Sequence, residues 1–227
     1  MNHDYTPAFY SRAAAVCLLA MIILGGCSLP RIIILNDPLS AEEHNHLGGI
    51  YEAQEKFDLA AQQYREALKK DKKSVTALLL LGDLAYRTKN YSEAESAYKK
   101  AIRLQPGNGD IYNNLCWVYL DRQNGIEKAE ELINTAIKTT PEHRAYYLDT
   151  LGVVLLRLGR TAESIAAFKE AIELLPKDKG GYLTEAYLHA AEAYCLAGDA
   201  AMAGEAEQAA ERYRVITSPV AGNELNQ

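Results

Sequence analysis

The stretch Val75–Asn108, VTALLLLGDLAYRTKNYSEAESAYKKAIRLQPGN, decides the fold. Its apolar and small residues form two stripes at helical spacing, one in each half: Leu78, Leu81, Gly82 and Ala85, then Tyr91, Ala94, Tyr98, Ala101 and Ile102. A polar turn at 87–90 separates the two helices, and Pro106 ends the second. A pair of helices this short cannot bury both stripes alone, so the pattern predicts a stack of similar units.

The 34-residue pattern recurs along the chain. A Leu–Gly pair and later alanines align the copies at about 41–74, 75–108, 109–144, 145–178 and 184–217. The fifth copy has Ala190–Ala191 in place of Leu–Gly and follows an apparent insertion at 179–183. Its second helix is polar, as expected of a terminal repeat that shields a stack from solvent.

The spacing and the small residues Gly82, Ala94 and Ala101 resemble the tetratricopeptide repeat (TPR), a helix-turn-helix family whose helices approach closely at such positions. The resemblance implies an all-α fold, a right-handed superhelical solenoid of about five repeats over residues 41–217. It also implies a binding scaffold for other proteins, with no catalytic residues and no cofactor.

The first 26 residues do not fit the repeats. Arg12 precedes an apolar run at 13–24, which is shorter than the roughly 20 residues of a transmembrane helix but suits a signal peptide. Leu24-Gly25-Gly26-Cys27 resembles the bacterial lipobox. This implies a lipoprotein signal peptide at 1–26 and acylation of Cys27, by palmitate among other chains. An uncleaved N-terminal anchor with an incidental cysteine is the alternative.

Residues 27–40 are expected to be a lipidated tether, and 218–227 a disordered tail. The Ile32–Leu35 run in the tether either packs on the first repeat or docks on a partner. Ser40 and Glu43 form a capping box that is expected to start the first helix. Ser28, rather than Asp, after the lipidated cysteine resembles lipoproteins passed on to the outer membrane, so we expect the protein there, facing the periplasm.

The composition and the positions of the cysteines limit the classes of function that are possible. The chain has 227 residues, is 48% hydrophobic and carries a net charge of -6, which suits a folded, acidic body and disfavours nucleic-acid binding. Cys116 and Cys195 fall on first helices about two repeats apart. Both are expected to be buried rather than paired in a disulfide or reactive.

The geometry of a helix argues against the candidate metal site. His44 and His46 point to different sides of a helix, unlike a metal-binding i, i+4 pair, and His143 and His189 are expected on the solvated surface. No metal site is expected.

A triad of Cys116, His143 and Asp149 can be written, but its cysteine would be buried and no oxyanion-forming loop is visible. The sequence therefore does not predict an enzyme.

In the TPR family the first helices line a concave groove. The resemblance carries this role over to a set of polar and aromatic residues in the middle repeats: Asp83, Tyr86, Arg87, Asp110, Asn113, Trp117, Asp121, Tyr146, Asp149 and Arg157. The fifth repeat contributes Glu185, Leu188, Glu192, Cys195 and Leu196. Over all five repeats, eight carboxylates face two guanidinium groups. These acids either attract a cationic partner or only favour helix N-termini.

Trp117, the only tryptophan, either anchors a partner or packs on the neighbouring repeat. The expected partner is an extended or helical protein segment with basic residues and a large apolar side chain, not a nucleic acid or a small-molecule substrate. A scaffold in envelope complex assembly is the predicted function. Lipobox and repeats together resemble pilus-assembly and outer-membrane-assembly lipoproteins, and an accessory binding subunit of an envelope peptidase is the other alternative.

Overall fold

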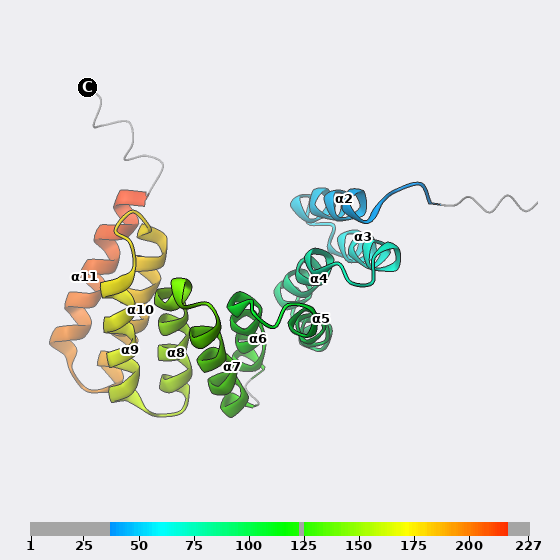
Figure 1. The fold of residues 1–227 in the computed structure, drawn as a ribbon. Coiled ribbons are helices and arrows are strands. Elements are labelled where there is room, and N and C mark those ends of the chain that lie inside the picture. The colour runs from blue at the N-terminus through cyan, green and yellow to red at the C-terminus, as the bar shows by residue number, and fades with distance from the viewer. Residues whose placement is uncertain (1–36, 123–124, 218–227) are drawn as a thin grey trace, which may run out of the picture. The chain divides into compact units, whose positions relative to one another are not determined.

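The computed structural model describes residues 37–122 and 125–217. In these ranges the chain forms ten α-helices and a short 3-10 helix, with no strand (Figure 1). Their bounds are α2 Ala41–Ala53, α3 Phe57–Lys70, α4 Val75–Arg87, α5 Tyr91–Leu104, α6 Gly109–Asp121, α7 Ile126–Thr139, η1 Pro141–His143, α8 Arg144–Arg157, α9 Thr161–Leu174, α10 Gly180–Leu196 and α11 Ala200–Thr217. The signal peptide, Cys27, the Ile32–Leu35 run and the tail at 218–227 lie outside the described residues.

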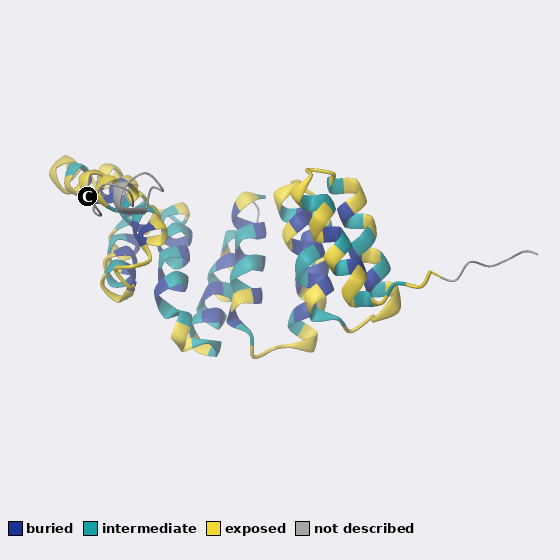
Figure 2. Ribbon diagram, turned by 90° about the horizontal axis from the view of Figure 1, so that it is seen from above, coloured by how far each residue is buried: buried dark blue, intermediate teal, exposed yellow. Residues whose placement is uncertain are grey.

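Consecutive helices pair, and each pair packs on the next (Figure 1). The first helices of the five pairs are α2, α4, α6, α8 and α10; each second helix also contacts the first helix that follows it. Buried residues recur along each helix rather than gathering at one centre (Figure 2). This arrangement confirms the predicted all-α repeat solenoid.

The start of the first helix follows the predicted capping box. Ser40 Oγ accepts from the backbone N–H of Glu43 at 3.2 Å, and Glu43 Oε2 accepts from the backbone N–H of Ser40 at 2.8 Å. The hydrogen bond from the Ser40 backbone lowers the pKa of Glu43, because it favours the charged carboxylate. Two of the free N–H groups of the first turn are thereby satisfied.

Size complementarity joins the two helices of a pair. A Cβ added at Gly82 would lie 2.7 Å from Cε1 of Tyr98, whose ring is 1% exposed. Gly48 meets Tyr64 and Gly152 meets Phe168 in the same way, at even closer range. The third repeat instead buries Cys116 and Ile133 fully in one cluster at the corresponding positions. A small residue therefore makes room for a large one in these four repeats.

The fifth repeat begins earlier than predicted. Helix α10 starts at Gly180, so residues 180–183, which the repeat pattern left outside the fifth copy, form its first turn. Leu183 is fully buried in one cluster with Ala145 and Leu175, and this burial explains the extension of the helix by a turn.

Helix α11 ends the described stack as predicted. Six of its charged and amide residues are exposed: Glu205, Glu207, Gln208, Glu211, Arg212 and Arg214.

The two cysteines within the described range are free but differ in environment. Cys116 is buried, and burial raises the pKa of its thiol to about 12. Cys195 is exposed near the end of α10, so the prediction that both are buried was wrong for Cys195. This exposure agrees instead with the groove position that the repeat pattern assigns to Cys195.

Candidate partner-binding surface

Trp117 of α6 is half-buried and lines two neighbouring cavities. The first has a volume of about 380 Å³ and is lined by Glu52, Asp83, Tyr86, Arg87, Tyr98, Asn114 and Trp117. The second, of about 140 Å³, is lined by Asn113, Trp117, Tyr146, Asp149, Thr150, Leu175, Tyr182 and Glu185. Nearly all of these residues come from first helices. We call the two cavities together the Trp117 groove.

Seven of the ten residues predicted to bind a partner line the Trp117 groove: Asp83, Tyr86, Arg87, Asn113, Trp117, Tyr146 and Asp149. Asp110, Asp121 and Arg157 line neither cavity, although Asp121 Oδ2 accepts from the hydroxyl of Tyr86 at 2.7 Å. Five lining residues were missed: Tyr98, Asn114, Thr150, Leu175 and Tyr182. Tyr98 and Leu175 belong to or follow second helices, and the repeat pattern assigns such residues to the core, whereas the other three lie on first helices beside the positions that the family pattern assigns to the groove.

The carboxylates of the first cavity already have donors within the chain. Glu52 forms an ion pair with Arg87 at 2.7 Å and accepts from the hydroxyl of Tyr64 at 2.6 Å. Oδ1 of Asp83 accepts from the hydroxyl of Tyr98 at 2.6 Å and from Nδ2 of Asn114 at 3.3 Å. Loss of solvation raises the pKa of Asp83 despite these bonds. The negative charge of this cavity is therefore partly compensated.

Two further carboxylates, which lie next to the fourth repeat or within it, also have donors within the chain. Asp110 Oδ1 accepts from the hydroxyl of Tyr147 at 2.6 Å and lies 2.9 Å from Nδ1 of His143. Nδ1 of His189 lies 3.0 Å from Oδ1 of Asp149, which joins α10 to α8. His143 and His189 are thus bound to carboxylates and do not simply face solvent, as the sequence had led us to expect.

His189 has a shifted protonation equilibrium. Burial alone would lower its pKa, but the hydrogen bond to Asp149 and the charges of Asp149, Glu185 and Glu192 outweigh burial, so the pKa of His189 is raised. Protonated His189 therefore compensates the charge of Asp149 over a wider pH range than a free histidine would.

Within the described residues, three of the eight predicted groove carboxylates have neither a hydrogen bond nor an ion pair. They are Glu42 in the first turn of α2, and Glu185 and Glu192 on α10. Glu42 lies at a helix N-terminus, where the macrodipole favours an acid whatever binds. The carboxylates that no donor of the described chain binds thus gather on α10, a distribution that counting acids in the sequence did not reveal.

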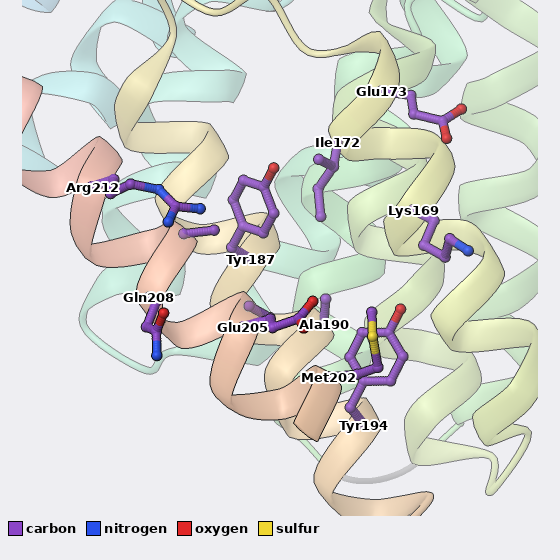
Figure 3. A pocket seen from close by; sticks show the side chains of 12 residues that line it. Lys169, Ile172, Glu173, Tyr187, Ala190, Tyr194, Met202, Glu205, Gln208 and Arg212 are labelled. Carbon is purple, nitrogen blue, oxygen red and sulfur yellow. The ribbon is translucent and has the colours of Figure 1, made fainter. Parts of the chain in front are cut away.

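A further cavity, of about 480 Å³, was not predicted. It lies over α10 between α9 and α11 (Figure 3) and is lined by Lys169, Ile172, Glu173, Tyr187, Ala190, Tyr194, Met202, Glu205, Ala206, Gln208, Ala209 and Arg212. Ion pairs such as Arg65–Glu93 between α3 and α5, and Arg160–Glu130 between α9 and α7, cross the corresponding spaces of earlier repeats. None crosses between α9 and α11 in the described chain. Met202, where the earlier repeats have Glu93 and Glu163, is the sequence signal that could have indicated this opening.

Within the described ranges, no group of three or more His, Cys, Asp or Glu side chains is arranged to hold a metal ion. None of the helices described is both long and apolar enough to span a bilayer.

Several known proteins are similar in sequence to part of this chain. The Type IV pilus assembly protein PilF of Pseudomonas aeruginosa is 26% identical over 145 residues, which cover 63% of this chain and 49% of PilF. The tetratricopeptide repeat-containing protein trd-1 of Caenorhabditis elegans is 24% identical over 144 residues, 63% of this chain and 18% of trd-1. The chain spans between 13% and 49% of the curated relatives that it matches.

Among solved structures, MamA superposes with a TM-score of 0.61 at 23% identity, covering 74% of this chain and 94% of MamA. At this identity the likeness concerns the fold alone. Three tetratricopeptide repeat models match residues 45–109, 89–151 and 145–178. Because these matches together span more than half of the chain, it belongs to the tetratricopeptide repeat family.

Proposed function

We propose that the protein is a lipoprotein anchored through Cys27 that acts as a scaffold in the assembly of a bacterial envelope complex. In this proposal the Trp117 groove holds a protein segment with basic residues and at least one large apolar side chain. The observation that carries the binding part is the position of Trp117, which is half-buried between two cavities formed by first helices. Large aromatic residues in such positions contribute strongly to protein–protein binding.

The lining of the groove supports a partner that donates hydrogen bonds and carries positive charge. Oδ2 of Asp83 receives no hydrogen bond within the described chain, because Tyr98 and Asn114 both donate to Oδ1. Oδ1 of Asn113 is buried and likewise has no donor there. A backbone N–H or a basic side chain of the partner would satisfy these acceptors, and a cation would also be attracted to the face of the indole.

Arg87 reduces the negative charge expected of the groove. It forms an ion pair with Glu52 and lies 5.0 Å from the centre of the Phe57 ring. A basic partner residue that binds Glu52 would have to displace this internal arginine. The apolar contact with Trp117 is therefore expected to contribute more to affinity than the acids of the first cavity.

Replacing Trp117 by alanine is expected to weaken partner binding by about 1–3 kcal/mol, because it removes an aromatic anchor. The partner would be isolated from solubilised envelopes with the lipidated protein, and its affinity measured with wild type and variant. Trp117 is the only tryptophan, so a shift of its fluorescence on binding reports on this site directly. Leu104→Ala, at an exposed position on α5, serves as the control. Unchanged affinity in Trp117→Ala would show that the partner binds elsewhere.

The envelope part of the proposal is supported by the lipobox resemblance and by the similarity to PilF, whose name assigns that protein to type IV pilus assembly. Neighbouring genes distinguish the alternatives. Secretin, pilin or barrel-assembly genes favour pilus or outer-membrane assembly, whereas a peptidase gene favours an accessory subunit of an envelope peptidase.

Membrane attachment is expected to depend on Cys27, because its acyl chains would be the anchor. The variant Cys27→Ala would be exported behind a signal peptide with an ordinary cleavage site, so that no uncleaved signal holds it at the membrane. After a high-salt wash, wild type should sediment with membranes and the variant should be soluble. A variant that still sediments with the membranes would contradict the lipoprotein assignment.

A further inference from the structure

The exposed side of α10, which includes the groove positions predicted for the fifth repeat, is unusually apolar for an exposed helix surface. Tyr182, Leu188 and Leu196 are 54%, 40% and 65% exposed, and they belong to the few large hydrophobic residues exposed in the described chain. They follow one another at intervals of six and eight residues, which keeps them on one side of a helix. The opposite side of α10, with Leu183 and Tyr194, is buried against neighbouring helices.

The same side of α10 carries two carboxylates that no donor of the described chain binds. Glu185 and Glu192 are exposed and have no hydrogen bond or ion pair within the described residues. In contrast, Glu52, Asp83 and Asp149 are all bound by donors of the chain itself. His189, the basic residue between them on α10, has its Nδ1 bound to Asp149 rather than to either glutamate.

We propose that the α10 face, defined as Tyr182, Glu185, Leu188, Glu192 and Leu196, docks a cationic amphipathic helix of the partner protein. The proposal rests on the function proposed above and adds the conformation of the bound segment and its second point of attachment. Opposite charge and exposed apolar side chains on one stripe together define the complementary partner.

The spacing along α10 specifies this helix further. Glu185 and Glu192 are seven residues, or two turns, apart, which corresponds to about 10.5 Å along the axis. Two lysines seven residues apart on a partner helix would match this separation. Tyr182 to Leu196 spans about 21 Å, the length of a helix of roughly 14 residues.

The α10 face continues into the Trp117 groove. Tyr182 and Glu185 line the cavity that Trp117 also lines, and the ring centres of Tyr146 and Tyr182 are 4.7 Å apart in an edge-on arrangement. A helix lying on α10 would therefore direct its end, or the chain that leaves it, toward Trp117.

The exposed thiol of Cys195 lies at the edge of the α10 face, seven residues or two turns after Leu188, and provides a local readout. Its alkylation can be followed by mass spectrometry at this residue, while the raised pKa and burial of Cys116 make that thiol a slow internal reference. The probe is a synthetic helix of about 15 leucines, alanines and lysines with the lysines seven residues apart. Matched peptides carry glutamate in place of lysine, or a central proline that breaks the helix.

The cationic helix should slow alkylation of Cys195 at least about tenfold at saturation, and the two matched peptides should not. The double variant Glu185→Gln and Glu192→Gln should weaken binding about tenfold and reduce its salt dependence, because two ion pairs are lost. Leu188→Ser with Leu196→Ser should weaken it similarly, whereas Leu174→Ser, at an exposed leucine of α9, should not. Equal protection by the anionic peptide, or full affinity in both double variants, would overturn the proposal.

Self-association must be separated from partner binding. Sedimentation of the protein alone should give a monomer at the concentrations used; a dimer that the Leu188→Ser and Leu196→Ser changes dissociate would mean that a second copy covers the α10 face, and would refute the partner helix. With the isolated partner, loss of binding in Trp117→Ala but not in the α10 variants would overturn this inference and leave the proposed scaffold intact. Unchanged binding in all of these variants would contradict both.

Discussion

Leucine in place of Gly82 is expected to lower the free energy of unfolding by about 3 kcal/mol or more. A Cβ at this position would already lie 2.7 Å from Cε1 of Tyr98, so the rest of the side chain has no space. The Tyr98 ring cannot easily move, because it is 1% exposed and its hydroxyl donates to Asp83. The substitution should therefore separate α4 from α5 in the second repeat.

Gly49→Leu is the matched control. It introduces the same side chain into a helix, but a Cβ at Gly49 meets nothing within 4 Å. Because leucine has a higher helix propensity than glycine, this variant should be as stable as wild type or more stable by up to about 1 kcal/mol. Thermal and urea denaturation followed by circular dichroism measure both effects. Equal melting temperatures for Gly82→Leu and wild type would refute the close helix contact.

A second large effect is expected where the third repeat departs from the pattern. Gly48, Gly82 and Gly152 each face a large ring, whereas Cys116 and Ile133 occupy the equivalent positions and are fully buried. Ile133→Phe alone should overpack this site and destabilise the protein by about 1–3 kcal/mol. Cys116→Gly alone should also destabilise it, by about 1 kcal/mol or more, because glycine weakens a helix interior and leaves a void.

Combined, the two changes recreate the small-to-large pairing of the other repeats. The double variant should therefore be more stable than the sum of the single effects implies, with a coupling energy of about 1–3 kcal/mol. A double-mutant cycle by chemical denaturation measures this term. Simple additivity would mean that residues 116 and 133 do not share one packing site.

Local patterns were sufficient for the repeated parts of the fold. The capping box of Ser40 and Glu43 and the two helical stripes of the second repeat depend on residues at most four positions apart, and the structure has both. Gly82 could be recognised as a close contact because its partner, Tyr98, lies in the same repeat. Such features recur with the period of the sequence, so the period reveals them.

The candidate site was predicted less completely. Seven of its ten predicted residues line the Trp117 groove, since first-helix positions are set by the repeat. The pairing of the acids was only partly predictable, because Tyr98 donates to Asp83 within one repeat whereas other donors come from neighbouring repeats. Tyr86 and Asp121 are separated by 35 positions, Tyr147 and Asp110 by 37, and His189 and Asp149 by 40. One pair of helices must stack on the next before these side chains meet.

The sequence by itself therefore determined the repeat, its helices, its family and the face that the first helices share, because these follow from periodic burial and local hydrogen bonding. Only the tertiary structure decided that α10 begins at Gly180 and that Glu185 and Glu192 are bound by no donor of the described chain. The physical reason is the same in each case. Burial of Leu183 and pairing of carboxylates depend on neighbouring repeats, and nothing within a single repeat specifies those neighbours.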